Sequence, residues 1–251
     1  MSPWQNLADE LARWEEAGQQ ATLWWRDDDA ADLTSALEDL AKLGHEFSVP
    51  LSLAVIPSLA QASLFDWCAA QPDTTTVLVH GFAHQNHASK GEKKCEFPAS
   101  RLREEMMAEL QNALAEMPET ALPVLVPPWN RISTDLITEL PGQGYRGLST
   151  YKARAQATTA EGLALNNCHI DPINWKNNKQ FLGEAETLAL VTTHLAERRT
   201  GAVDSSEITG LLTHHLVQDK KTWDFLQKFF AWTAEQPSVR WLDAHEVFKL
   251  G

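Results

Sequence analysis

The sequence predicts an α/β fold, a single distorted (β/α) barrel with about seven to eight mostly parallel strands. Short apolar runs alternate with helical patterns along almost the whole chain, as expected for parallel βαβ units. The length of 251 residues suits one such barrel. Apolar residues make up 43% of the chain and charged residues 22%, which is enough apolar surface to bury a full core.

The expected strands are apolar runs, and the expected helices have apolar residues at helical spacing between them. Proline and glycine mark the joints, as at Gly44, Pro57, Pro118 and Pro141. We expect strands at 22–26, 49–56, 76–80, 122–126, 145–150, 163–170, 208–214 and 239–242. We expect helices at 31–43, 59–70, 100–116, 133–140, 181–199 and 220–235, and a polar loop at 88–97.

The first 20 residues predict an amphipathic helix packed on the barrel, because Trp4, Leu7, Leu11 and Trp14 recur at helical spacing. This segment has no basic start followed by an apolar stretch, so we expect no export signal and a cytoplasmic protein. No apolar run is long enough for a membrane span. We therefore expect residues 1–251 to form a single catalytic domain.

The net charge of -13 argues against nucleic acid and against anionic membranes as partners, and a neutral substrate fits it better. A local basic patch stays possible. The three cysteines, Cys68, Cys95 and Cys168, are an odd number at wide spacing, so we expect reduced thiols. The sequence leaves the oligomeric state open.

Polar residues follow the ends of several expected strands, which is where a parallel barrel places its active site. Because these strand ends face one way, residues distant in sequence converge on one mouth. The residues in this position are Asp27, Asp28, His80, Pro128, Asp171 and His214.

The first motif, WWRDDDA at 24–30, leads an apolar strand directly into three carboxylates. Adjacent like charges repel, and burial raises the cost, so a divalent cation is a natural partner. One carboxylate can bind a metal while its neighbour acts as a base. The alternative is a helix N-terminus, which accounts for Asp29 or Asp32 but less well for all three carboxylates together.

The second motif, HGFAHQNH at 80–87, follows an apolar strand. His80 and His84 are four residues apart, which places both imidazoles on one face if a helical turn follows the strand. Two histidines and one carboxylate form a zinc site that leaves a position open. Asn86 is a candidate to orient a ligand or contact substrate.

The segment LVPPWNR at 125–131 places two prolines after a strand. The amide of Trp129 is a candidate oxyanion donor, and its ring a candidate wall or sugar-stacking platform. We include Asn130 and Arg131 in the expected substrate-binding set. A rigid strand-to-helix turn is the structural alternative.

Two later motifs supply candidates for acid catalysis. In HIDPINW at 169–175, Asp171 could orient a histidine and Trp175 could line the pocket, or the segment could be an Asp-Pro turn. In GLLTHHLVQD at 210–219, one of His214 and His215 should face the mouth as a general acid. We favour His214.

With these five segments in this order, the chain resembles the polysaccharide deacetylase family, carbohydrate esterase family four, from Trp24 to about Val247. Members of that family have a distorted (β/α) barrel and remove acetyl groups from N-acetylated sugars. The resemblance implies Asp27 as the base and Asp28, His80 and His84 as the metal ligands. It also implies that Pro127–Trp129 matches the proline-rich segment, and that Leu212–His214 carries the acid.

The chain departs from the family pattern at three positions. Asp29 stands where glycine is usual, Gly81 where serine or threonine is usual, and Val126 where an arginine normally pairs with the base. Arg26 and Arg131 are candidate replacements for that arginine.

The resemblance therefore implies a metal-dependent deacetylase, a hydrolase of carbon-nitrogen bonds other than peptide bonds, with one divalent metal ion, expected to be Zn²⁺. A metal-bound water is the expected nucleophile, with Asp27 as base, His214 as acid and Asp171 as its partner. Two alternatives stay open: an amidohydrolase for another small C–N substrate, and an inactive barrel that binds carbohydrate or metal.

Overall fold

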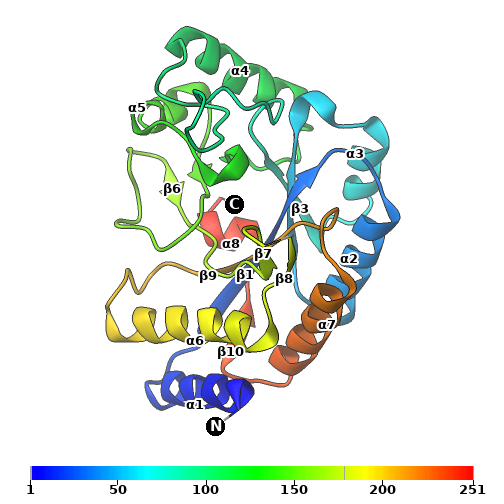
Figure 1. The fold of residues 1–251 in the computed structure, drawn as a ribbon, viewed down its shortest axis with the longest axis vertical. Coiled ribbons are helices and arrows are strands. Elements are labelled where there is room, and N and C mark those ends of the chain that lie inside the picture. Colours follow the sequence, from blue (N-terminus) through cyan, green and yellow to red (C-terminus); the bar gives the residue numbers. More distant parts are fainter. Residues whose placement is uncertain (1, 178, 251) are drawn as a thin grey trace.

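The computed structural model describes residues 2–177 and 179–250 (Figure 1). Its strands are β1 Ala21–Ala30, β2 Leu51–Val55, β3 Thr75–Val79, β4 Val124–Leu125, β5 Gly147–Leu148, β6 Ala164–Leu165, β7 Ile173–Asn174, β8 Gln180–Phe181, β9 Thr209–Thr213 and β10 Val239–Trp241. Its α-helices are α1 Pro3–Glu16, α2 Ser35–Glu46, α3 Ala62–Ala69, α4 Arg103–Glu116, α5 Thr134–Ile137, α6 Glu184–Thr200, α7 Lys220–Ala234 and α8 Ala244–Phe248. Short 3-10 turns lie at η1 Pro57–Leu59, η2 Pro128–Asn130 and η3 Leu140–Gln143.

A parallel sheet organises the molecule. Its strands are hydrogen-bonded in the order β10-β1-β2-β3-β4-β5-β6, and β9 also pairs with β1. Isolated bridges from Tyr151 to Cys168 and from Ile170 to Leu211 continue the pairing from the β5 side round to β9. The sheet is thus curled into the distorted barrel that the sequence predicts.

The interior of the barrel is apolar at one end and polar at the other. Trp24, Leu78, Val124 and Leu212 face inward and pack with α8, whose Phe248 meets the ring of Trp24 edge-on at 5.6 Å between centroids. Figure 1 shows α8 in red at the centre of the molecule. These apolar side chains and α8 fill one end of the barrel. A polar site can therefore form only at the other end, where the strands have their carboxyl ends.

The outward faces of the strands pack under the helices. Leu23 and Trp25 of β1 belong to a core with residues of α2, α6 and α7. The amphipathic helix expected at the N-terminus is α1, which lies along α6 (Figure 1). Its buried Glu10 accepts hydrogen bonds from Arg199 of α6 at 2.7 and 3.0 Å.

Several boundaries differ from the sequence prediction. β1 continues through the three aspartates to Ala30, and the expected helix at 133–140 is split into α5 and η3. The antiparallel β7–β8 hairpin and α8 were not predicted, because two-residue strands and a five-residue helix carry too little periodicity to be detected. None of the helices in the described part of the chain is long and apolar enough to cross a bilayer.

Candidate active site

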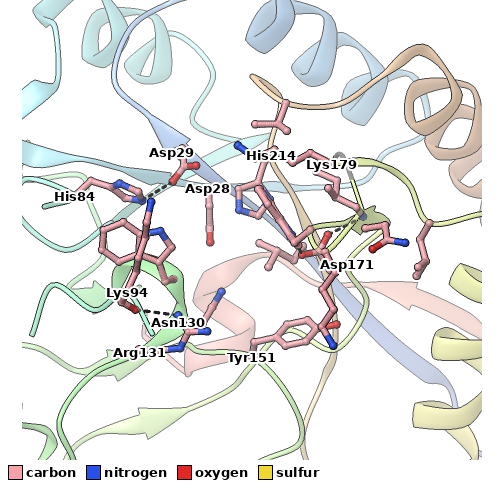
Figure 2. Close-up of a pocket in the computed structure, with 18 of the residues that line it drawn as sticks. Asp28, Asp29, His84, Lys94, Asn130, Arg131, Tyr151, Asp171, Lys179 and His214 are labelled. Carbon is pink, nitrogen blue, oxygen red and sulfur yellow. Dashed lines mark hydrogen bonds and ion pairs between the residues drawn. The ribbon is translucent and has the colours of Figure 1, made fainter. Parts of the chain in front are cut away.

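A pocket of about 840 Å³ opens at the carboxyl ends of the parallel strands (Figure 2). Asp28, near the end of β1, lines it together with His80 and His214, which directly follow β3 and β9. Of the six residues expected to converge at the mouth, these three and Asp171 line the pocket, whereas Asp27 and Pro128 are not among its lining residues. The pocket is also lined by Asp29, His84, Trp129, Asn130, Arg131, Asp171 and Trp175.

The three aspartates of β1 point in different directions. Successive side chains of a strand point to opposite faces, so Trp24, Arg26 and Asp28 face the barrel interior while Trp25 and Asp27 face the outer layer. Asp29 breaks the alternation. Its φ is 72°, and the pairing of β1 with β2 shifts register between Asp27 and Ala30, so its carboxylate turns back to the mouth.

Asp29, not Asp28, lies beside the two histidines of the HxxxH motif. Its Oδ1 is 3.0 Å from His80 Nε2 and 3.2 Å from His84 Nε2, and the three ligand atoms lie within 4.8 Å of one another. The set expected from the sequence thus changes by one residue. The sequence prediction matched the family's acidic pair to Asp27 and Asp28, whereas the geometry favours Asp28 and Asp29.

The directions of the pKa shifts of Asp29 and His80 agree with this arrangement. Burial raises the pKa of Asp29, but hydrogen bonds from His80 and His84 outweigh it and hold that pKa below its ordinary value. Burial lowers the pKa of His80, but the carboxylates of Asp29 and Asp28 outweigh it and raise the net value. Positive charge is therefore favoured between these side chains, whether it comes from a proton or from a cation.

A backbone hydrogen bond sets the tautomer of His80. Its Nδ1 lies 2.9 Å from the carbonyl oxygen of Val126, and only a protonated Nδ1 can donate there. The lone pair of neutral His80 is then on Nε2, directed at Asp29. Metal-binding histidines are commonly oriented by such a bond from the other ring nitrogen.

The loop between His80 and His84 is not the expected helical turn. Gly81 has φ 62° and His84 has φ 53°. The carboxylate of Glu96 accepts the amides of Phe82 at 3.1 Å, Ala83 at 2.8 Å and Gln85 at 3.3 Å. A buried carboxylate therefore replaces helical hydrogen bonding in this loop.

Glu96 also explains one departure from the family pattern. A Cβ at position 81 would lie 2.0 Å from Glu96 Oε2 and 2.5 Å from Pro128 Cδ, so only glycine fits there. The sequence analysis did not identify Glu96 as a site residue. In the sequence Glu96 is one of two glutamates in a loop rich in lysine, and that signal is too weak to single it out.

Of the two candidate arginines, Arg26 is the one that pairs with a carboxylate of the site. Its guanidinium is fully buried and forms a bidentate ion pair with Asp28, with Nε–Oδ1 at 2.8 Å and Nη2–Oδ2 at 3.0 Å. Its remaining donors bond to Asn130 Oδ1 at 2.7 Å and Ser149 Oγ at 2.6 Å. Asp28 is therefore the arginine-paired carboxylate of this site.

Asp27 does not reach the pocket. It is fully buried in the outer layer, where it accepts hydrogen bonds from Thr213 Oγ1 at 2.7 Å and from the backbone amide of His215 at 3.0 Å, and its Oδ1 lies 2.5 Å from His215 Nδ1. The placement of Asp27 as the base is thus corrected. Asp27 and His215 thus lie in the outer layer, and Asp28 and His214 lie at the mouth, which continues the alternation of β1 and of β9 past its last residue, Thr213.

His214 lines the pocket opposite the Asp29 side, with Asp171 beyond it (Figure 2). The ring of Trp175 packs edge-on against His214 at 4.8 Å, and its indole nitrogen donates to Asp171 Oδ2 at 2.6 Å. Burial raises the pKa of Asp171, and the charge of His214 opposes this. Asp171 is therefore linked to His214 through the Trp175 side chain, and it also accepts a hydrogen bond from the amide of Ile173 at 2.9 Å.

The residues after the two prolines reach the pocket through an unusual backbone. Trp129 and Asn130 both have positive φ, 56° and 58°, and the Trp129 ring packs against His84 at 4.5 Å. Asn130 is engaged with Arg26, while Arg131 donates to the carbonyl oxygen of Lys94 at 2.9 Å. The four residues expected to bind substrate, including Trp175, all line the pocket.

A second group of metal-ligand residue types lies away from the pocket. His169, His194 and Glu207 have ligand atoms within 4.8 Å of one another and are all buried. The two imidazoles stack at 3.5 Å between centroids, and His169 Nε2 is 3.3 Å from Glu207 Oε1. Here the backbone amide of Gly210 donates to His169 Nδ1 at 2.9 Å, so the ring proton of neutral His169 is on Nε2.

No family model matches the sequence, and no curated protein sequence matches it. Solved structures do match the fold. A structure described as a putative polysaccharide deacetylase from Mycobacterium smegmatis aligns with a TM-score of 0.66 at 13% identity, over 92% of this chain and 90% of that one. A peptidoglycan N-acetylglucosamine deacetylase aligns with a TM-score of 0.58 at 13% identity, over 96% and 97%.

The same architecture also occurs with other chemistry. A 4-alpha-glucanotransferase from Thermococcus litoralis aligns with a TM-score of 0.51 at 10% identity, over 93% of this chain and 41% of that one. A shared fold does not by itself define a reaction. The chain has the distorted barrel fold of the polysaccharide deacetylases and family 4 carbohydrate esterases, which confirms at the level of the fold the resemblance carried by its motifs.

Proposed function

We propose that this protein is a metal-dependent hydrolase that removes an acyl group, in the first place acetyl, from an N-acylated sugar or related substrate. The observation that carries the proposal is the placement of Asp29, His80 and His84 beside the arginine-paired Asp28, with His214 lining the same pocket. An inactive binding barrel has no need for a carboxylate and an imidazole on either side of a cation site.

The residues of the cluster fit one divalent cation, and zinc is the ion we propose. Two imidazole nitrogens and one carboxylate are a common catalytic zinc set that leaves coordination positions free. The Val126 carbonyl presents His80 Nε2 in the tautomer that a metal requires. Such an ion supplies a Lewis acid that activates water and polarises the acyl carbonyl.

Asp28 is the proposed general base. It lines the pocket next to Asp29 and is held at both oxygens by Arg26, which fixes its orientation. Arg26 in turn has no freedom to move, because Asn130 and Ser149 take its other donors. A base positioned in this way can accept the proton of the attacking water as the new C–O bond forms.

His214 is the proposed general acid. It can donate a proton to the amine that leaves when the C–N bond breaks. The Trp175 ring packs edge-on against His214, and the indole nitrogen of Trp175 donates a hydrogen bond to Asp171. The backbone amide of Trp129, whose ring packs against His84 in the pocket wall, is the proposed donor to the oxyanion.

Elemental analysis of tag-free protein tests the proposal, together with acetate release from N-acetylated chito-oligosaccharides. We expect about one zinc-like ion per chain and acetate release that a chelator abolishes and added zinc restores. The proposal is wrong if the protein retains no divalent ion after incubation with zinc, cobalt or manganese. Acetate release that is insensitive to chelators would also contradict it.

A further inference from the structure

The pocket has a charge balance opposite to that of the chain. The chain contains 21 Lys+Arg and 34 Asp+Glu, yet four basic residues, Lys94, Arg131, Lys176 and Lys179, line this one pocket. Figure 2 shows Lys94 and Arg131 on one side of it and Lys179 on the other. The basic residues therefore flank the candidate catalytic groups on both sides.

The carboxylates of the pocket do not offset these charges. Asp28 is neutralised by Arg26, Asp29 faces the two histidines of the cation site, and Asp171 is bound to Trp175 and faces His214. No ion pair found among residues 2–177 and 179–250 involves any of the four basic side chains. Their charge is available to a ligand.

Two of the lysines each lie over a tryptophan ring. Lys94 Nζ lies 5.6 Å from the centroid of the Trp129 ring, and Lys179 Nζ lies 5.8 Å from that of Trp175. Each ring also packs against a site histidine, Trp129 against His84 and Trp175 against His214. A flat apolar surface next to a positive charge suits a sugar ring that carries a negatively charged substituent.

We infer that the substrate is an N-acylated sugar that carries an anionic group, a phosphate or a carboxylate, next to the sugar that bears the acyl amide. This inference rests on the proposed function and names its substrate class. In a protein of net charge -13, a cationic pocket attracts such a substrate through a locally focused field, while the rest of the surface repels it. The neutral substrate expected from net charge alone is therefore replaced by an anionic one.

Equilibrium binding to the zinc-loaded full chain, followed by tryptophan fluorescence, tests the inference. The probes are N-acetylglucosamine, its 6-phosphate, and N-acetylmuramic acid, which separate a neutral sugar, a phosphate and a carboxylate. At low salt we expect at least one anionic probe to bind about 10-fold more tightly than the neutral sugar, because two favourable charge contacts contribute about that much. High salt should reduce the difference.

The variant K94Q/K179Q separates the lysines from direct anion binding to zinc. We expect it to bring the anionic and neutral dissociation constants together, while K42Q/K221Q, an equal change of charge at exposed residues outside the pocket, leaves their ratio as in the wild type. The inference is overturned by equal binding of neutral and anionic probes, or by a preference unchanged in K94Q/K179Q. Failure of both anionic probes to bind at about 10 mM also overturns it.

The acetate assay distinguishes a failure of this inference from a failure of the proposed function. Metal-dependent acetate release from a neutral sugar, without any anion preference, would retain the proposed hydrolase and remove the anionic substrate class. Anion preference without acetate release under any metal condition would remove the proposed hydrolase and retain the preference of the pocket for an anionic sugar.

Discussion

Two clusters of the molecule have the same composition: Asp29, His80 and His84 at the mouth of the barrel, and His169, Glu207 and the α6 residue His194 in the interior. Each cluster contains two imidazoles and one carboxylate, with ligand atoms within 4.8 Å of one another. They differ in what the backbone does to one histidine. A carbonyl oxygen accepts from Nδ1 of His80, whereas an amide donates to Nδ1 of His169.

That difference favours the cluster at the mouth as the proposed cation site. His80 has its Nε2 lone pair free for a metal, while neutral His169 has a proton on Nε2 facing Glu207. The cluster at the mouth also lines the pocket, and the other is packed in the interior. Proximity of ligand-type residues is therefore not sufficient for a metal site, because the backbone must present the correct tautomer.

The largest expected effect is on metal content. His84→Ala should lose the bound ion and essentially all hydrolytic activity, because two ligands are too few for a stable site. His194→Ala should retain about one ion per chain, as in the wild type. Elemental analysis of the three proteins measures this directly, and two ions per wild-type chain with one lost in His194→Ala would reverse the comparison.

The next effect separates the neighbouring aspartates of β1. Asp28→Asn should keep the metal and lose about 100- to 10,000-fold in turnover, the usual contribution of a general base. Asp27→Asn is the matched control, since the same substitution is made one residue away on the outer face. We expect it to reduce thermal stability through its bonds to Thr213 and His215, with a much smaller loss of turnover.

Metal content, thermal unfolding and turnover should be measured on both aspartate variants. Full activity of Asp28→Asn would remove it as the base. Equal loss of turnover in a stably folded Asp27→Asn would restore the original sequence prediction.

A smaller effect is expected at the loop that carries His84. Glu96→Gln replaces a carboxylate that accepts three backbone amides by a group with only one acceptor oxygen. We expect metal affinity, measured by competition with a chelator, to fall by about 10- to 100-fold, as for other residues that orient ligands. Glu92→Gln, at an exposed position of the adjacent loop, is the control.

An unchanged metal affinity in Glu96→Gln would show that the loop holds its shape without the carboxylate. Circular dichroism and the unfolding midpoint should be recorded in parallel, so that a local loss of the loop is distinguished from global unfolding.

The smallest effect concerns the buried histidine cluster and pH. Burial and the charges of His169 and Arg198 lower the pKa of His194 to about 2, and burial, together with Arg198 and Arg154 and against Glu207, lowers the pKa of His169. Below a pH of about 6.5 the unfolded chain binds protons that the folded cluster excludes, so stability is complete above that pH and falls as the pH drops.

Urea unfolding at pH 7.5 and 5.5 should show this loss, at most about 1.4 kcal/mol per pH unit for each histidine. His194→Phe keeps a planar ring and removes one titrating group. We therefore expect the difference in free energy of unfolding between the two pH values to be smaller in this variant. An equal pH dependence in wild type and variant would contradict the assignment of His194 as a neutral buried histidine.

Much of the fold could be predicted from the sequence because its information is local. The apolar runs that became β2, β3 and β9 differ from the predicted strands by only a few residues. The HxxxH motif and the run of aspartates were recognisable as candidate ligands because each follows an apolar strand. The hairpin of β7 and β8 and the plug formed by α8 could not be predicted, because long-range packing rather than periodicity stabilises such short elements.

The sequence by itself determined the α/β barrel, the mouth where the candidate residues meet, and the residue types available there. Only the tertiary structure decided which of two neighbours faces the pocket: Asp28 instead of the predicted Asp27, and His214, which the sequence favoured, over His215. The physical reason is that β1 is apolar on both faces, as Trp24 and Trp25 show, so hydrophobic alternation gives no indication of which residues point inward. Pairing with β9 and the positive φ of Asp29 settle that choice, and both depend on contacts between distant parts of the chain.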